Sequence, residues 1–255
     1  MTSPATLEHE VVSKDEWLKK VAELLVKEKE LTRLNDELSR RRRELPWHRV
    51  EANYIFDGPR GELGLADLFD GRSQLAVYHF MFGPDWGEGC PGCSYVTDHM
   101  DGALAHLRAR DVSLVLISRA PLEKLAEFKR RMGWHIPWVS SGRCDFNRDF
   151  RVSFTKDEVA AAAPLYNHAT RAPYAEENPG MSFFTKDAGG AIFHTYSTYA
   201  RGLDVLLGTY VILDRAPKGR DEAGLPSSMA WLRHHDKYQP TVQGIAPCCH
   251  NPESH

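Results

Sequence analysis

Apolar residues near the N-terminus recur at the spacing of one face of a long helix. The pattern begins after Ser13, which together with Glu16 fits the S-x-x-E capping box. It ends in a run of four arginines, which complements the negative end of a helix dipole, and Pro46 stops it. The apolar stripe consists of Trp17, Val21, Leu24, Leu25, Leu31, Leu34, Leu38 and Leu45. We therefore predict a helical arm over residues 1–46, packed on the main domain or on a second copy of the chain.

Between residues 74 and 139 the pattern changes to alternating strands and helices. Gln74–Phe82 is an almost continuous apolar run, typical of a strand buried on both faces, and Val112–Ile117 is a second one. Residues 96–107 and 121–133 carry apolar positions at helical spacing, and Ile136–Val139 is a short strand candidate. This succession predicts a parallel α/β layer with right-handed crossovers.

The second half of the chain adds a predicted antiparallel hairpin. Met181–Lys186 and Ala191–Tyr196 flank a turn that contains Gly189 and Gly190. Before the hairpin, residues 159–178 are expected to be irregular or weakly helical. After it, residues 200–214 are expected to form a last helix and a short strand. The organisation we expect is one main domain over 47–238 and a C-terminal tail over 239–255.

Composition and charge narrow the classes of function. The net charge is −3 in 255 residues, so we expect no general attraction to nucleic acid or to an anionic membrane. No apolar run approaches the ~18–20 residues that span a bilayer. The first ten residues lack the basic and apolar regions of a secretory signal, and we therefore expect a cytoplasmic protein. Five cysteines in a chain of this length do not indicate a disulfide framework, and in a reducing compartment paired cysteines indicate catalysis or metal binding.

Cys90 and Cys93 form such a pair, at the junction between the strand over 74–82 and the following helix. Cys90 is expected at the helix N-terminus, where unpaired N–H groups and the helix dipole stabilise a thiolate. Cys93 follows one turn later, close enough to form a disulfide with Cys90 and to release a mixed-disulfide partner. A C-x-x-C pair between a strand and a helix is typical of thioredoxin-like redox proteins. The chain has neither a dinucleotide fingerprint nor a P-loop, so redox cycling of this pair requires no organic cofactor.

A metal site is the alternative that the sequence leaves open. Two thiolates and an imidazole suit Cu(I) or, with a fourth ligand, zinc, and His194 in the predicted hairpin is the candidate that would join Cys90 and Cys93. A sheet histidine hydrogen-bonded to a neighbour is the simpler interpretation of His194. Cys144 is expected to be a small buried hydrophobic residue. The cysteines and histidine of Cys248–His250 have no assigned role.

Several longer stretches resemble a known family. FMFGPDWGEGCPGCSYVTDHMDG, ISRAPLEKLAEFKRRMGW, SSGRCDFNRDF, FHTYSTYARGLDVLLGTYVILDRAPKGRDE and KEKELTRLNDELSRRRRELPW are similar to DUF899, a thioredoxin-like group often labelled dithiol–disulfide oxidoreductase. The resemblance covers about residues 10–240. It implies a thioredoxin-like α/β fold, a central mixed sheet flanked by helices. It further implies that Cys90 is the attacking thiol and Cys93 the resolving thiol, acting on a protein or small-molecule thiol or disulfide.

Three residues near the cysteines are candidates for substrate contact. Trp86 lies in the loop before Cys90, where an aromatic ring commonly walls a redox site, and the carboxylate of Asp85 is placed to relay a proton. Pro179 is the candidate for the cis-proline that thioredoxin-like sites carry before the hairpin, although it lies two residues before Met181. A peroxidase activity ranks lower, because peroxide-reducing relatives normally carry Thr-x-x-Cys and no threonine precedes Cys90 here.

Overall fold

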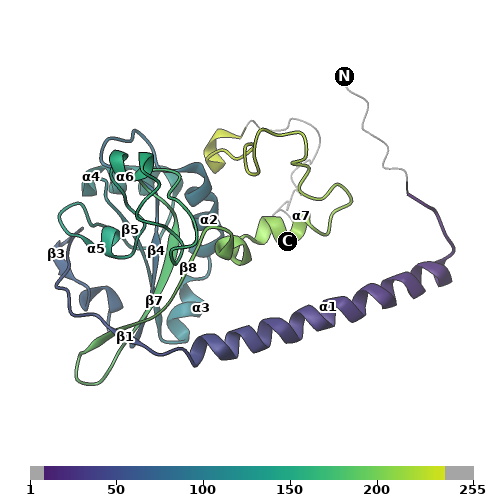
Figure 1. Ribbon diagram of the computed structural model, residues 1–255, viewed down its shortest axis with the longest axis horizontal. Helices are drawn as coiled ribbons and strands as arrows, with labels where there is room; N and C mark the ends of the chain where they lie inside the picture. Colours follow the sequence, from purple (N-terminus) through teal and green to yellow (C-terminus); the bar gives the residue numbers. More distant parts are fainter. Residues whose placement is uncertain (1–8, 239–255) are drawn as a thin grey trace, which may run out of the picture.

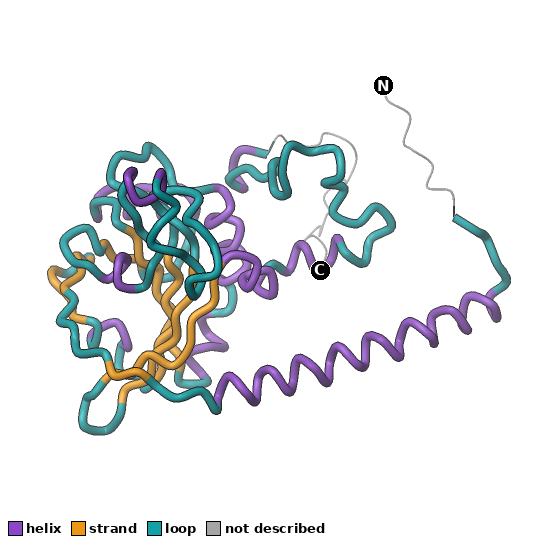
Figure 2. The backbone as a smooth tube through the Cα atoms, viewed as in Figure 1, coloured by secondary structure: helices purple, strands orange, loops and turns teal. Residues whose placement is uncertain are grey.

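The computed structural model describes residues 9–238. A mixed sheet with helices on both faces forms the body, and one long helix extends away from it (Figures 1 and 2). The strands are β1 (His48–Arg49), β2 (Ile55–Gly58), β3 (Gly61–Gly64), β4 (Gln74–His79), β5 (Val112–Ser118), β6 (Trp138–Ser140), β7 (Gly180–Lys186) and β8 (Ile192–Tyr199). The α-helices are α1 (Lys14–Arg43), α2 (Pro91–Asp101), α3 (Leu104–Ala109), α4 (Leu122–Met132), α5 (Phe146–Asp149), α6 (Lys156–Ala160) and α7 (Gly208–Leu213). Three 3₁₀ turns are η1 (Asp67–Phe69), η2 (Ala200–Leu206) and η3 (His235–Lys237).

The strand order across the sheet is β1-β8-β7-β4-β5-β6-β2-β3. Strands β4, β5 and β6 are parallel, and the connections between them contain α2 and α4. Strand β7 lies antiparallel to β4 and forms a hairpin with β8, while β1 and the β2–β3 hairpin extend the two edges. A parallel βαβ unit followed by an antiparallel hairpin on the other side of its first strand is the thioredoxin-like arrangement. The predicted fold is confirmed.

Successive residues of β4 face opposite sides of the sheet, as the pleat requires. Ala76 and Tyr78 belong to a hydrophobic cluster shared with α2 and α4, whereas Leu75 and Val77 belong to a second cluster shared with η1 and α5. His79 faces this second side, where its ring stacks on Phe146 at 5.6 Å. The sheet therefore separates two cores, and the side of a residue is set by its parity along the strand.

Two predicted elements differ from the structure. The helix expected over 96–107 is two helices, α2 and α3, because α2 ends with Gly102 as its C-cap. The strand expected within 200–214 is absent, since this region forms η2 and α7. The irregular segment over 159–178 is confirmed apart from the end of the short helix α6. Within the described residues, no helix is both long and apolar enough to cross a membrane.

The helical arm contacts the body only near its C-terminal end. No residue of α1 is buried. The guanidinium of Arg42 lies over the Tyr196 ring at 5.6 Å, and just beyond the helix Trp47 packs on Phe193 with ring centres 5.9 Å apart. The rest of α1 projects from the body (Figure 1). Its apolar stripe is thus not covered by the main domain of the same chain.

Candidate active site

Cys90 is the N-cap residue of α2, and Pro91 is the first residue of the helix. The backbone of Cys90 is fixed on both sides: its N–H donates to the Met81 carbonyl at 3.1 Å, and its own carbonyl accepts from the Ser94 N–H and hydroxyl, each at 2.9 Å. Pro91 suits this place because the first helical N–H has no partner within the helix. The strand-to-helix junction predicted from the sequence is therefore present, with Cys90 at the positive end of the helix dipole.

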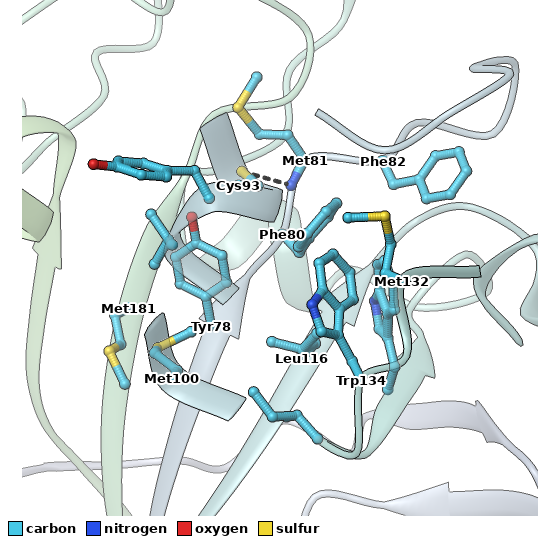
Figure 3. Packing of buried hydrophobic residues seen from close by; sticks show 14 of the residues in the cluster. Tyr78, Phe80, Met81, Phe82, Cys93, Met100, Leu116, Met132, Trp134 and Met181 are labelled. Carbon is cyan, nitrogen blue, oxygen red and sulfur yellow. Dashed lines mark hydrogen bonds between the residues drawn. The ribbon is translucent and has the colours of Figure 1, made fainter. Parts of the chain in front are cut away.

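The two thiols differ sharply in exposure. Cys90 is partly exposed, whereas Cys93 retains only 2% of its accessible surface. The Met81 N–H donates to the Cys93 sulfur at 3.4 Å, which ties the inner thiol to the end of β4 (Figure 3). Both thiols are free in this structure. Cys90 is therefore accessible from solvent, whereas Cys93 is not.

Their ionisation differs in the same sense. The pKa of Cys90 is lowered to about 7, chiefly because the Cys93 thiol donates a hydrogen bond to its sulfur. The backbone N–H groups of Cys93 and Gly92 add to this effect, and burial opposes it. Burial raises the pKa of Cys93 well above that of an ordinary thiol, and the neighbouring Cys90 raises it further. At neutral pH the outer sulfur is substantially a thiolate and the inner one a thiol.

Phenol groups surround the inner thiol, a feature that the sequence analysis missed. Tyr78 is fully buried, and its hydroxyl has no partner of ordinary hydrogen-bond geometry among the described residues. Figure 3 shows this hydroxyl on the Cys93 side of β4. The pKa of Tyr78 is raised well above its usual value, first by burial and then by the charge of Cys93, while the phenol in turn lowers the pKa of Cys93. The hydroxyl of Tyr174 reaches the Met81 sulfur at 3.8 Å. The sequence could have indicated Tyr78, because it lies two residues before Phe80 and therefore faces the same side of the sheet. No local pattern identifies Tyr174.

The loop before Cys90 contains two of the expected substrate contacts. Trp86 packs against the core cluster that includes Cys93, so its ring is partly buried. The Lys124 ammonium holds this loop by donating to the Pro84 and Trp86 carbonyls at 2.8 and 3.2 Å. Asp85 is exposed and has no hydrogen bond or ion pair within the described residues. Substrate contact by Trp86 and Asp85 stays a prediction.

Pro179 lies directly before β7, at the sheet edge where β4 ends. Among the described residues only Ala163–Pro164 is a cis peptide bond, so Pro179 follows a trans bond. Its carbonyl accepts a hydrogen bond from the Tyr166 hydroxyl. The expectation of a cis-proline at this position is therefore wrong.

His194 does not join the two cysteines, and the proposed metal set of Cys90, Cys93 and His194 is wrong. The His194 ring packs on Phe150 and Phe184, with centres 5.1 and 5.4 Å apart, on the side of the sheet opposite Cys93. The described residues contain no cluster of three or more His, Cys, Asp or Glu side chains that could hold a metal ion. The simpler interpretation of His194 as a hydrogen-bonded sheet histidine agrees with its 2.7 Å contact to the Ser197 hydroxyl. The irregular β7–β8 register at Phe183/Phe184 changes which face His194 takes, and the sequence alone does not reveal such an irregularity.

The other cysteines do not extend the site. Cys144 is partly buried against the second core cluster, and burial raises its pKa, as expected of a hydrophobic cysteine. The segment Cys248–His250 lies outside the described residues.

A buried ion pair lies between the loops that follow β5 and precede β7. Arg119, which directly follows β5, contacts Glu177 at 3.1 Å. The Glu177 carboxyl is 3% exposed and accepts a hydrogen bond from the Ser153 hydroxyl at 2.5 Å. Burial raises the pKa of Glu177 to about 7, against the lowering effects of Ser153 and Arg119. No sequence signal identified Glu177, because its burial depends on three segments that are distant in the chain.

The C-terminal segment 229–238 fastens the loop that leads into Cys90. The buried His234 ring contacts the Gly89 carbonyl at 2.8 Å through Nε2. Glu88 forms ion pairs with Arg131 at 2.6 Å and with Lys237 at 2.7 Å. Residues before and after the active helix are thus connected through the end of the described chain.

Comparisons with solved structures give low similarity over most of the domain. Peroxidoxin BcpB from Mycobacterium tuberculosis is 16% identical, with 65% of this chain and 95% of that chain covered and a TM-score of 0.43. A structure of Xanthomonas campestris peroxiredoxin Q is 14% identical, with 65% of this chain and 95% of that chain covered and a TM-score of 0.45. No curated protein matches the sequence. The model of one family matches residues 6–238, so the chain belongs to the family DUF899, described as a bacterial protein of unknown function.

Proposed function

We propose that this protein is a dithiol–disulfide oxidoreductase that cycles Cys90 and Cys93 between two thiols and a disulfide. The observation that carries the proposal is the asymmetry of the pair. Cys90 is accessible and its pKa is lowered to about 7, whereas Cys93 is buried and its pKa is raised. Disulfide exchange needs one thiolate that meets the substrate and a second thiol that resolves the intermediate.

The reaction balances within the pair and its partner. The Cys90 thiolate attacks one sulfur of a substrate disulfide, whose S–S bond breaks, and the leaving thiolate takes a proton from water. Cys93 then loses its proton and attacks the Cys90 sulfur, which releases the second substrate thiol. The substrate gains two electrons and two protons, and the pair becomes a disulfide. An external dithiol or thiol reductant returns it to the starting state.

We assign substrate contact to two residues of the loop before Cys90 and to the proline that precedes β7. Trp86 would provide an apolar wall, Asp85 a carboxylate for proton relay and Pro179 a backbone edge beside the end of β4. The partner is a protein or small-molecule thiol or disulfide. The two sulfur atoms hold the electrons, so this chemistry requires neither an organic cofactor nor copper or zinc. A cytoplasmic location belongs to the proposal, because thiol reductants that regenerate the pair are abundant there.

Dimerisation through α1 is a further part of the proposal. It is supported by the apolar stripe of α1, which the described part of the same chain leaves exposed.

The test equilibrates the full chain in dithiothreitol buffers of graded potential, followed by alkylation and peptide mass analysis. We expect one two-electron transition that joins Cys90 to Cys93, lost in Cys90→Ser and retained in the matched control Cys144→Ser. Cys93→Ser should trap a mixed disulfide between Cys90 and oxidised glutathione. If no Cys90–Cys93 disulfide forms at any potential, or if Cys93→Ser accumulates no mixed disulfide, the proposal fails.

A further inference from the structure

A cavity of about 590 Å³ lies on the side of the sheet that carries His194, away from the two thiols. It is bounded by the β1 and β8 edge, by residues 149–151 and by residues 165–169. Its volume is within the ~300–1,000 Å³ typical of small-molecule sites. Nothing in the proposed thiol chemistry uses this cavity.

The wall combines apolar side chains with unpaired cationic ones. Val50, Leu165 and Tyr199 contribute the apolar part. Arg49 and Arg151 also line the cavity, and within residues 9–238 neither guanidinium has an ion-pair partner. Two carboxylates share the wall. Asp149 accepts the Tyr54 hydroxyl at 2.7 Å, and Glu51 is exposed. Apolar walls with a few polar groups that orient the ligand are the usual composition of a binding site.

A chain of buried hydrogen bonds begins at the cavity and runs under β8, β7 and β4. His194 Nε2 contacts Ser197 Oγ at 2.7 Å, Ser197 Oγ contacts Ser182 Oγ at 2.8 Å, and Ser182 Oγ contacts His79 Nε2 at 2.8 Å. Both serines and His79 are at most 2% exposed. Burial of a polar group in a sheet core is costly unless the group is hydrogen-bonded, and both serine hydroxyls are paired here, whereas His79 Nδ1 has no partner among the described residues.

This chain fixes the proton of His194. Nε2 also lies 3.1 Å from the Tyr196 carbonyl, which can only accept, so Nε2 carries the hydrogen. Burial lowers the pKa of His194, so the ring is neutral near pH 7. Nδ1 therefore keeps its lone pair, and it has no partner among the described residues. Because His194 lines the cavity, this unpaired nitrogen is the acceptor that its ring can offer to a ligand there.

Strained backbone holds another wall of the cavity. Asn167, His168 and Ala169 are consecutive residues in the left-handed region, with φ of 53°, 55° and 61°, and Arg151 has φ of 54°. Non-glycine residues rarely adopt this region, because their Cβ comes too close to the following carbonyl oxygen. His168, Ala169 and Arg151 all line the cavity. Strain of this kind concentrates at ligand clamps and functional sites.

We propose that this cavity binds a small apolar acid that carries a hydroxyl group. Its carboxylate pairs with Arg49 and Arg151, its hydroxyl donates to His194 Nδ1, and its apolar body packs on Leu165 and Tyr199. The site is independent of the dithiol.

Isothermal titration of the full chain with 4-hydroxybenzoate tests the proposal. Two analogues each remove one group: 4-hydroxybenzamide lacks the charge, and benzoate lacks the hydroxyl. We expect saturable binding of 4-hydroxybenzoate, and roughly tenfold weaker binding of each analogue, because each loses one charged or neutral hydrogen-bonded contact.

Two variants assign the contacts. Arg151→Gln should lose most of the preference for 4-hydroxybenzoate over 4-hydroxybenzamide and keep the preference for 4-hydroxybenzoate over benzoate. His194→Phe should keep the first preference and lose most of the second. His194→Phe keeps an aromatic ring at this position. If His194→Phe misfolds, Arg151→Gln still tests the proposal. The proposal is overturned if 4-hydroxybenzoate shows no saturable binding, or if both preferences survive in both variants.

Discussion

The reactivity of Cys90 depends most on its neighbour Cys93, whose thiol is the largest cause of the lowered pKa. Cys93→Ala removes this donor, so the Cys90 pKa should rise above 7. The midpoint of the curve of Cys90 alkylation rate against pH should therefore lie at a higher pH than in the natural protein. Cys93→Ser retains a hydroxyl donor and should bring the midpoint back toward 7. The measurement is the rate of iodoacetamide labelling of the Cys90 peptide between pH 5 and 10. Equal midpoints in the alanine variant and the natural protein would show that the helix N-terminus alone controls Cys90.

Glu177 links stability to pH. Its folded pKa of about 7 lies above the value of about 4.5 for an unperturbed glutamate, so the folded state binds the extra proton between these values. Stability contributed by the neutral carboxyl is therefore present below about pH 4.5 and is lost as pH rises through 7. The loss amounts to about 3 kcal/mol by the ordinary conversion of a pKa difference.

Glu177→Gln imitates the neutral carboxyl and should remove the pH-dependent part of the stability that Glu177 contributes. Urea unfolding at pH 5 and pH 8 measures it. The variant should be close to the natural protein at pH 5 and more stable than it at pH 8. An equal difference at both pH values would mean that Glu177 stays ionised throughout, held by Arg119.

Single residues also show what a sequence can and cannot predict. The spacing of Cys90 and Cys93 after an apolar run was sufficient to place both thiols, because the helix start is a local property. His194 was misplaced because its side of the sheet depends on the β7–β8 bulge at Phe183/Phe184, which local alternation does not reveal. Tyr78 and Glu177 were missed because their role depends on burial by distant segments.

At the scale of elements, α1 carries leucines at heptad spacing. Leu24, Leu31 and Leu38 lie seven residues apart, as at the d positions of a coiled coil, although Glu28 and Asn35 interrupt the stripe. A parallel pair would set the four arginines of each helix, Arg40–Arg43, against each other, whereas an antiparallel pair places them at opposite ends. A second copy of α1 in antiparallel orientation is therefore the partner that suits this helix.

We expect the natural protein to be a dimer, and Leu31→Lys should make it a monomer, because the lysine places a charge at the centre of the apolar stripe. Val26→Lys is a matched control on the other side of the helix, since both side chains are similarly exposed in the single chain, at 58% and 55%. Light scattering coupled to size-exclusion chromatography measures the mass. A monomeric natural protein, or a monomer in both variants, would contradict pairing along this stripe.

The order of elements was largely predictable, since β4, β5, α4 and the β7–β8 hairpin follow from strong local periodicity. The break between α2 and α3 was not predicted, and the short strand expected within residues 200–214 does not form beside the expected helix. These short elements depend on tertiary packing: the His99 ring at the end of α2 accepts the Thr209 N–H at 2.9 Å. A short stretch of sequence does not include both partners of such a contact.

Across the whole molecule, the segment 229–238 contacts the loop before Cys90, although the two are separated by about half of the chain. His234 lies under this loop with 2% of its surface exposed and contacts the Gly89 carbonyl. Arg131 joins Glu88 and Asp236, so the same contact region includes α4. The position of the reactive thiol therefore depends on the docking of the C-terminal segment as well as on α2.

His234→Ala should loosen this docking. It removes the donor to a buried carbonyl, which costs about 1–3 kcal/mol, and leaves a void beside the Phe128 ring, 5.2 Å from the histidine. Amide hydrogen exchange over residues 83–90 should accelerate, and Cys90 should be alkylated faster at fixed pH because the loop opens. His235→Ala is the control, since that neighbouring side chain is exposed and contacts Asp98 instead. If exchange over 83–90 is unchanged while overall stability falls, His234 serves general packing and does not control the thiol loop, and the position of Cys90 is then set by α2 and the Met81 carbonyl alone.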